Sequence, residues 1–517
     1  MFNAVLNYFS EFKVLKSASR DFWLTNALQF FDGLAYFSMI TVLALYLTTN
    51  CGFNDVDSGA WVGIFTLYIT AFVFAVGSIC DAIGIKKSLY IGLGLLAVSR
   101  LGMGVAPVLL DNVPIQWSLF GHPVEIMPLQ WTIKAMIIVM SLGTAFMSPV
   151  IMTSMRRFTS KKTRATGFNI YYLLMNIGAI IATAIVLDGF RNGLPWLAWL
   201  SGGILPNGVD EFLRNGFGKV GGNLAIFDFG FAMSVCALIC ALMIDENNFA
   251  EESERVELGG EPRRPLAIFL EVWRERAFQK LLLFLVLTIG VRLVFTHQFL
   301  VMPKFYTRVL YGDFELGLVN AINPAIIVFG LILIIPVINR YPTVKLIIIG
   351  MSVSAASLVF LAMPIEWVLS LPGINNLNQA YFFVIIAQIV TFAVGELIFN
   401  PRFMEYVASV APQDRVSSYM ALSGLPNFIA KPINGFVSGI LIARYCYDGI
   451  RPKIETGNIP YDQSPGFMWL VYLILAVLSP IAVIALKNFI TSKSSDAPSG
   501  GADNENTPAE ADQQPAA

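Results

Sequence analysis

Residues 77–87 have the sequence GSICDAIGIKK and separate two long apolar stretches, 60–80 and 88–107. A second segment, PVINRYPTVK at 336–345, repeats this arrangement more weakly about half a chain later. Glycines in the first copy allow a tight turn against a neighbouring helix, and Asp81 and the two lysines can form ion pairs that break and re-form. The repetition indicates an internal duplication of the chain. An ordinary positively charged loop is the alternative interpretation.

The composition around this repeat is that of a membrane protein, because 56% of the 517 residues are hydrophobic and only 13% are charged. A net charge of -1 provides no basic field to attract nucleic acid. The 5 cysteines and 2 histidines are scattered over separate stretches, without the spacing of a metal site or a disulfide framework. We therefore expect no nucleic-acid partner, no metal and no cofactor.

Membrane-spanning helices are predicted wherever about 20 apolar residues can cross the roughly 30 Å hydrocarbon layer. The sequence predicts an all-α membrane protein with twelve transmembrane helices in two six-helix bundles. The span at 417–442 is interrupted by Pro426, Lys431 and Pro432. The predicted spans are 23–48, 60–80, 88–107, 132–154, 167–187, 224–244, 281–302, 316–338, 344–363, 380–400, 417–442 and 467–488.

The domain organisation follows from these spans and from the charged stretch between the sixth and seventh. Within that stretch, residues 266–276 have helical apolar spacing and could lie on the membrane surface. Segments 106–131 and 189–222 are expected at the interface or over the outer face. The predicted domains are a cytoplasmic N-terminus (1–22), an N-terminal bundle (23–244), a cytoplasmic linker (245–280), a C-terminal bundle (281–488) and a disordered cytoplasmic tail (489–517).

The orientation is predicted from the loops, because basic residues are retained on the cytoplasmic side. Most of the 34 lysines and arginines fall on one side when the N-terminus is placed inside. Both termini are therefore expected in the cytoplasm. The first span is too long for the apolar region of a cleavable signal peptide. We expect a multi-pass protein of the cell membrane, most simply a bacterial inner membrane, acting as a monomer.

The loop at 77–87 resembles the loop signature of the major facilitator superfamily, whose members have two six-helix bundles with a solute site between them. Three further stretches are similar to the proton-dependent oligopeptide transporter family: AYFSM at 35–39, GFNIYYLLMNIGA at 167–179, and GEL at 395–397, where the family places a substrate-contacting glutamate. The resemblance implies a gating loop containing Gly77, Asp81, Gly84, Lys86 and Lys87.

Two departures from the family pattern fall where the family couples transport to protons. The family's Glu-x-x-Glu-Arg is QFFDG at residues 29–33, with one carboxylate and no arginine. The lysine of its fourth-helix motif is Ser148. The sequence therefore favours the architecture of a peptide transporter without the family's usual coupling groups.

Ionisable residues within spans are costly, about 2.5–3.5 kcal/mol each on insertion scales, so they usually face a partner, a cavity or the bundle interior. Asp32 is interpreted either as a protonatable carboxylate or as the partner of a static ion pair with Arg100 or Lys134. Glu396 is the stronger candidate for proton coupling and for gripping a positive substrate end. Arg292 is predicted to face the cavity, with snorkelling to the interface as the alternative.

The remaining candidates keep two interpretations each. Lys431 binds an anionic group or pairs with Glu396. Arg100 is functional or snorkels, and Lys134 is an interface anchor or functional. His297 relays protons or is a core histidine bonded to a backbone carbonyl. A polar and aromatic lining for a peptide-like solute, with core packing as its alternative, is predicted from Tyr36, Tyr171, Tyr172, Asn176 and Asn323.

Taken together, these residues predict a secondary transporter for a small peptide-like or zwitterionic solute, working by alternating access and coupled to protons through Asp32 or Glu396. The chain has no Gly-x-x-x-x-Gly-Lys-Ser/Thr phosphate loop for ATP-driven transport. An uncoupled facilitator or exporter of another metabolite is the alternative, and a receptor-like protein that no longer transports is another. A membrane enzyme is disfavoured, because no nucleophile and base are evident together.

Overall fold

A computed structural model describes residues 18–119, 122–160, 163–194, 207–215, 222–248, 276–310, 315–338, 341–410 and 423–491. The described part contains nine helices long and apolar enough to cross a membrane, or ten if one bent pair is a single span. The prediction of a multi-pass, helical membrane protein is confirmed. Helices also lie at the other two predicted spans, a shorter apolar one at Leu316–Gly330 and one at Leu425–Tyr445, and neither is among these nine or ten.

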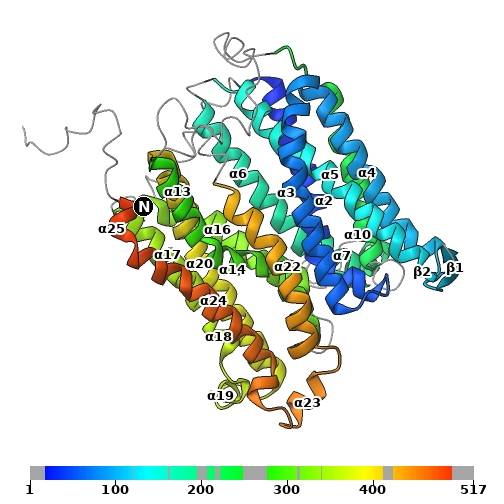
Figure 1. Ribbon diagram of the computed structural model, residues 1–517, viewed down its shortest axis with the longest axis vertical. Coiled ribbons are helices and arrows are strands. Elements are labelled where there is room, and N and C mark those ends of the chain that lie inside the picture. The colour runs from blue at the N-terminus through cyan, green and yellow to red at the C-terminus, as the bar shows by residue number, and fades with distance from the viewer. Residues whose placement is uncertain are drawn as a thin grey trace, which may run out of the picture.

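The N-terminal half packs its helices around α2, which is flanked by α6 and α10 (Figure 1). The fifth span is helical in two forms, because the α-helix α6 continues as a π-helix, η2. The elements of this half are α2 (Arg20–Thr49), α3 (Asp55–Ile83), α4 (Ile85–Leu109), α5 (Pro128–Arg157), α6 (Arg164–Ile180), η2 (Ile181–Leu187), α7 (Asp188–Arg191), α9 (Asn207–Asn215) and α10 (Asn223–Met243).

The C-terminal half forms the second group of helices in Figure 1, from green to red. Its first span is bent by 48° between α13 and α14. The elements are α13 (Arg276–Leu287), α14 (Ile289–Leu300), α15 (Met302–Val309), α16 (Leu316–Ile338), α17 (Thr343–Ala356), α18 (Val359–Ala362), α19 (Ile365–Leu369), α20 (Leu377–Val410), α22 (Leu425–Tyr445), α23 (Arg451–Glu455), η3 (Tyr461–Gln463), α24 (Pro465–Ala485) and α25 (Lys487–Thr491).

A two-stranded hairpin was not expected from the sequence. Strands β1 (Ile115–Leu119) and β2 (His122–Ile126) pair antiparallel within the segment 106–131, with Trp117 opposite Val124. We call the end of the molecule that carries this hairpin, α19 and α23 the hairpin end (Figure 1). The opposite end, where α2 begins and α24 ends, is the terminal end.

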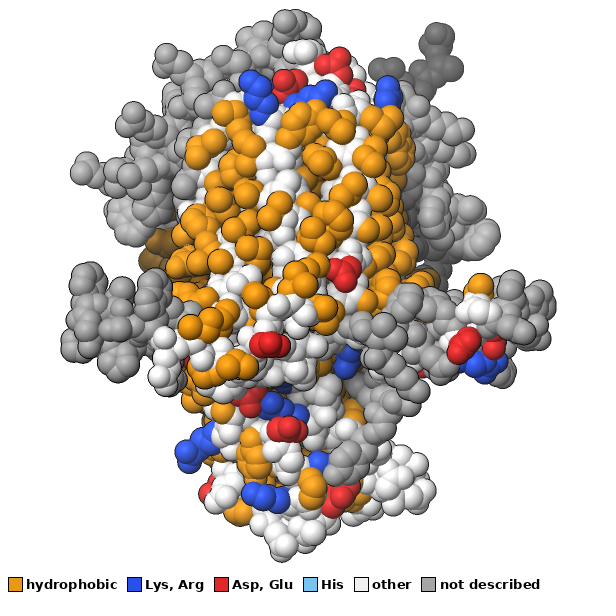
Figure 2. All heavy atoms as spheres, turned by 90° about the vertical axis from the view of Figure 1, so that its right-hand side faces the viewer, with side chains coloured by type: hydrophobic (Ala, Val, Ile, Leu, Met, Phe, Trp, Pro, Cys, Tyr) orange, Lys and Arg blue, Asp and Glu red, His pale blue; other side chains and the backbone are white. Residues whose placement is uncertain are grey.

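The surface between the two ends is apolar. Figure 2 shows a broad band of hydrophobic side chains, with charged side chains gathered above and below it. Exposed residues of this kind include Val98, Ile239 and Leu242. Such a band matches the hydrocarbon layer of a bilayer, because lipid replaces water as the surrounding solvent there.

Glycines allow two helices from different halves to touch. A methyl group added at Gly59 would lie 2.5 Å from the Cα of Gly439, and one added at Gly435 would lie 2.4 Å from the Cα of Gly63. On each helix the two glycines have the spacing Gly-x-x-x-Gly, Gly59 with Gly63 on α3 and Gly435 with Gly439 on α22. This spacing brings helix backbones together in membranes. This contact holds α3 against α22, next to each other in Figure 1.

Several predictions fall outside the described residues: the N-terminal segment before 18, the amphipathic stretch up to 275, residues 195–206 and the tail from 492. The domain boundaries remain predictions. The predicted start of the eleventh span at 417 also lies outside, whereas its described helix begins at Leu425 and contains Pro432.

Candidate functional site

Asp32 lies in an ion pair inside the N-terminal half. Arg100 Nη2, on α4, is 2.8 Å from Asp32 Oδ1 on α2. Arg100 Nη1 donates a hydrogen bond to Ser234 Oγ on α10 at 2.6 Å. Gly230, one turn before Ser234, leaves room for the arginine, since a methyl group there would lie 3.2 Å from Arg100 Cδ. Only 1% of the Arg100 side chain is exposed, so it does not snorkel to the interface.

Lys134 is not the partner of Asp32. Its ammonium lies 5.0 Å from the centroid of the Trp131 ring, and the rings of Phe53 and Trp61 lie within 5.7 Å. Of the two pairings considered for Asp32, the structure contains the one with Arg100. The protonatable role of Asp32 remains a prediction.

Glu396 on α20 is the centre of a second polar cluster, in the C-terminal half. Its Oε2 accepts a hydrogen bond from Asn323 Nδ2 on α16 at 3.1 Å, and its Oε1 accepts from Asn400 Nδ2 at 3.0 Å. The oxygen of the same Asn400 amide accepts from Arg292 Nη1 at 3.0 Å. One amide therefore bridges the carboxylate and the guanidinium.

Arg292 on α14 is enclosed by aromatic rings. The centre of its guanidinium lies 5.1 Å from the Phe295 centroid, 4.8 Å from that of Phe399 and 4.6 Å from that of Phe403. Ring faces attract a cation, and a desolvated pair of this kind contributes about 2 kcal/mol. This aromatic cage replaces part of the hydration that Arg292 loses on burial. Phe399 and Phe403 are four residues apart on α20, so both rings lie on the same face of that helix.

Helix α6 connects the two clusters. Tyr171 interacts electrostatically with Asp32 of its own half, whereas Tyr172 interacts with Glu396 and Arg292 of the other half. Asn176 donates to the Tyr172 carbonyl at 2.9 Å. The predicted residues thus approach from both halves, with α6 packed against α2 on one side and α16 on the other.

The other predicted lining residues are placed less centrally. Tyr36 on α2 is partly buried and packs edge-on against Phe37, with 5.5 Å between the centroids. Lys431 on α22 is partly buried and forms no ion pair within the described part of the chain. The pairing of Lys431 with Glu396 is therefore not found, and a role in anion binding remains a prediction.

His297 on α14 is a core residue but lacks the predicted hydrogen bond, and its role as a proton relay remains a prediction. It is buried beside Trp469 and Tyr472, and neither ring nitrogen has a hydrogen-bond partner among the described residues. The predicted bond to a backbone carbonyl is absent there. The described part of the chain also contains no cluster of three or more His, Cys, Asp or Glu that could hold a metal ion.

The gating loop predicted from the family resemblance lies at the terminal end. Gly84 separates α3 from α4 with φ 87°, a conformation that glycine adopts without strain. The backbone amide of Lys86 donates to Glu246 Oε2 at 3.1 Å, and Lys87 is exposed. Gly77 and Asp81 lie in α3, but their side-chain surroundings are outside what the structure describes.

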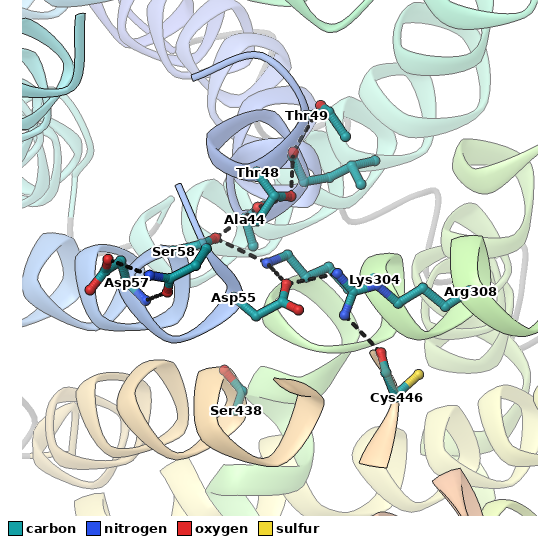
Figure 3. Close-up of polar contacts among 12 residues, drawn as sticks. Ala44, Thr48, Thr49, Asp55, Asp57, Ser58, Lys304, Arg308, Ser438 and Cys446 are labelled. Carbon is teal, nitrogen blue, oxygen red and sulfur yellow. Dashed lines mark hydrogen bonds and ion pairs between the residues drawn. The ribbon is translucent and has the colours of Figure 1, made fainter. Parts of the chain in front are cut away.

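A cluster at the hairpin end joins the halves and was not found from the sequence. Asp55 Oδ1, at the start of α3, is 2.9 Å from Lys304 Nζ and 2.7 Å from Arg308 Nη2, both on α15 (Figure 3). Lys304 also donates to Ser58 Oγ, and Arg308 donates to the Cys446 carbonyl after α22. We call these residues the Asp55 cluster.

Burial distinguishes Lys304 from an ordinary surface lysine. Only 2% of its side chain is exposed. Burial lowers the pKa of Lys304 to about 8, although the Asp55 carboxylate raises it in part. The available sequence signal was the spacing of Lys304 and Arg308, four apart just after the seventh span.

A second carboxylate ties the halves together. Asp188, at the end of η2, accepts hydrogen bonds from the backbone amides of Gly317 and Leu318, both at 2.7 Å. These amides are the free donors at the N-terminus of α16, where the helix dipole favours an anion. The hairpin end is therefore closed by the Asp55 cluster, the Asp188 contact and the glycine contact between α3 and α22.

Comparison with known proteins agrees with this architecture. The family model described as Major Facilitator Superfamily matches residues 25–433. Comparison with curated protein sequences finds no match.

Solved structures with the same fold include three transporters. A POT family transporter in complex with 5-aminolevulinic acid has a TM-score of 0.63 at 14% identity, covering 92% of this chain and 97% of that one. A structure from work on substrate recognition in proton dependent oligopeptide transporters has a TM-score of 0.57 at 16% identity, covering 91% and 97%. A nucleoside transporter has a TM-score of 0.59 at 14% identity, covering 90% and 100%. Since the family model covers most of the chain, the protein belongs to the major facilitator superfamily.

Proposed function

We propose that the protein is a secondary transporter that moves a small peptide-like or zwitterionic solute across the membrane by alternating access. Its family and fold are those of membrane transporters. The observation that carries the proposal is the Glu396 cluster, in which a carboxylate and a caged guanidinium lie near Tyr172 of the opposite half. Charged groups are retained at such a depth where a solute or an ion uses them.

The solute class follows from the two charges of this cluster. Glu396 provides an acceptor for an ammonium group, and Arg292 provides a donor for a carboxylate. Asn400 bonds both groups and fixes their positions, so a zwitterion can bind with its ammonium at Glu396 and its carboxylate at Arg292. The related transporter solved with 5-aminolevulinic acid binds a molecule that carries both an amine and a carboxyl group.

The direction of opening follows from the orientation predicted by the loop charges. We place the hairpin end outside the cell and the terminal end in the cytoplasm of a bacterial inner membrane. The described conformation is then closed to the outside by the Asp55 cluster and Asp188. We take the monomer as the transporting unit, since the Glu396 cluster and both contacts are built from one chain.

Proton coupling is proposed through Glu396, with Asp32 as the other carboxylate. Protonation of Glu396 would remove the charge that its amide partners stabilise, so release of the solute and of the proton would be linked. The ion pair of Asp32 with Arg100 favours a second candidate, an uncoupled facilitator, because it gives this carboxylate a fixed partner within its own half.

Uptake of a labelled dipeptide into proteoliposomes, with and without an inward proton gradient, tests the proposal. Accumulation driven by the gradient is expected, and Glu396→Gln is expected to reduce the rate by about 100-fold, a loss of about 2.7 kcal/mol. Equilibration without accumulation would support the facilitator. Binding without flux would contradict transport.

A further inference from the structure

Two adjoining cavities lie at the hairpin end of the C-terminal half, away from the Glu396 cluster. The larger has a volume of about 780 Å³ and lies between α19, α23 and the start of α20. The smaller, of about 170 Å³, lies between α18, α19, α20 and the segment before α24. Ile365, Glu366 and Ile454 line both, so the two cavities lie next to each other. The larger cavity has the size of a small-molecule site, about 300–1,000 Å³.

The larger cavity has a polar rim with one unmatched negative charge. Arg451 Nε donates to Glu455 Oε1 at 3.0 Å, which neutralises that carboxylate. The Glu366 carboxylate has no hydrogen-bond or ion-pair partner within the described part of the chain, and it interacts electrostatically with Tyr381. Amides from Asn376 and Gln379 complete the rim. A cation is the ligand charge that this rim complements.

The smaller cavity provides an apolar recess beside that carboxylate. Its walls come from Phe360, Met363, Val384 and Ile459. The Tyr461 hydroxyl, which also faces this region, is already occupied by donation to the Ala362 carbonyl. Burial of an apolar group here is favourable by about 25 cal/mol per Å² of surface removed from water. Glu366 lies where the polar rim and the apolar recess meet.

The cavities are connected to the closed contact between the halves. Arg451, a lining residue, donates from Nη1 to the backbone carbonyl of Val309, the last residue of α15. The same helix carries Lys304 and Arg308, which bind Asp55 of the N-terminal half. A ligand that contacts the rim thus touches the segment that supports α15.

We propose that these cavities form a second binding site, for an amphipathic cation whose ammonium group pairs with Glu366 and whose apolar part enters the recess. The proposal does not depend on the solute of the Glu396 cluster. The proposed second site does not require a carboxylate on its ligand, whereas a site for zwitterions does.

Binding of phenylalanine amide to the purified protein in lipid nanodiscs, measured by calorimetry, tests the proposal. This probe has an ammonium group and an apolar ring but no carboxylate. N-acetyl-phenylalanine amide is its neutral counterpart. We expect the neutral probe to bind at least tenfold more weakly. Equal affinity for the two probes would overturn the assignment of a cation site.

Three variants locate the bound probe. Glu366→Gln is expected to weaken binding at least tenfold, and Ile459→Trp, which places a larger side chain in the wall of the recess, is expected to abolish it. Asp462→Asn is the matched control, because it removes an exposed carboxylate nearby that does not line either cavity. Unchanged binding in Glu366→Gln or in Ile459→Trp would refute the proposal.

Glu396→Gln distinguishes this site from the central one. We expect it to leave phenylalanine amide binding unchanged while reducing dipeptide transport. Loss of probe binding in Glu396→Gln would place the probe in the central cluster and overturn the second site, whatever the outcome for transport.

Discussion

Two carboxylates of the N-terminal half form ion pairs of nearly the same length, but their partners lie in different places. Asp32 is 2.8 Å from Arg100, a residue of its own half. Asp55 is 2.9 Å from Lys304 and 2.7 Å from Arg308, both in the other half. When the halves rock as rigid bodies, the first pair stays intact and the second must separate. The half of the molecule that carries the partner therefore decides whether an ion pair supports the fold or controls access. The length of the ion pair does not.

The largest expected effect tests the pair within one half. Arg100→Met leaves the partly buried Asp32 without its cation, and breaking a buried pair by removing one partner costs about 3–5 kcal/mol. We expect a marked fall in the temperature of unfolding, measured in detergent by tryptophan fluorescence. Adding Asp32→Leu should recover most of the loss, because two apolar residues leave no buried charge. A double variant as unstable as the single one would contradict a purely structural role.

The second prediction concerns pH and the pair between the halves. In the closed state the pKa of Lys304 is about 8, below its usual value near 10.5, whereas opening returns the ammonium to water. The open state therefore binds more protons between these two values. Raising the pH through this window favours the closed state, by at most about tenfold per pH unit. Below pH 8 the effect vanishes, since Lys304 is protonated in both states.

The measurement is the distance between spin labels placed on the two halves at the hairpin end, recorded from pH 7 to 10. The other titratable or charged groups near Lys304 are Asp55, Arg308 and Cys446, whose carbonyl accepts from Arg308. None of these three residues is substituted in the experiment. Lys304→Arg is the matched control, because arginine keeps its charge over this range. A pH dependence that persists in Lys304→Arg would assign the effect to another group.

The sequence predicted the membrane architecture because hydrophobic length and loop charge act locally along the chain. It also selected Arg292, Glu396, Asn323 and Tyr172 one by one, since each is a polar residue within an apolar stretch. The last three were selected in part through the resemblance to the peptide transporter family. Their connection through Asn400 was missed: an amide four residues after Glu396 has no sequence feature that indicates it bridges two charges.

The Asp55 cluster was missed for a related reason. Asp55 begins a helix, where an acidic residue is common, and Lys304 and Arg308 follow a span, where basic residues are common. Each residue is ordinary in its local context. Only the packing of the two halves shows that they meet, and helix packing is not fixed by one sequence.

The third prediction concerns the amide bridge inside the C-terminal half. Asn400→Ala removes the amide that bonds both Glu396 and Arg292, without removing either charge. Hydrogen bonds to charged groups contribute about 1.5–3 kcal/mol, so we expect the KM for the dipeptide to rise by about tenfold. The temperature of unfolding should change less than in Arg100→Met. An unchanged KM would show that the amide does not organise the solute site.

The smallest expected effect concerns the second contact between the halves. Asp188→Asn keeps an amide oxygen that can accept from one of the α16 amides, but it removes the negative charge at the helix N-terminus. A charge in this position contributes about 0.3–1 kcal/mol, so the closed state should lose at most about fivefold in population. The spin-label distances at the hairpin end measure this shift at pH 7, where Lys304 is protonated in both states. Because Asp188 bonds backbone amides rather than a lysine, its effect should add to that of Asp55→Asn. A double variant no more open than Asp55→Asn alone would mean that the two contacts separate in a single step, with the Asp55 cluster holding both.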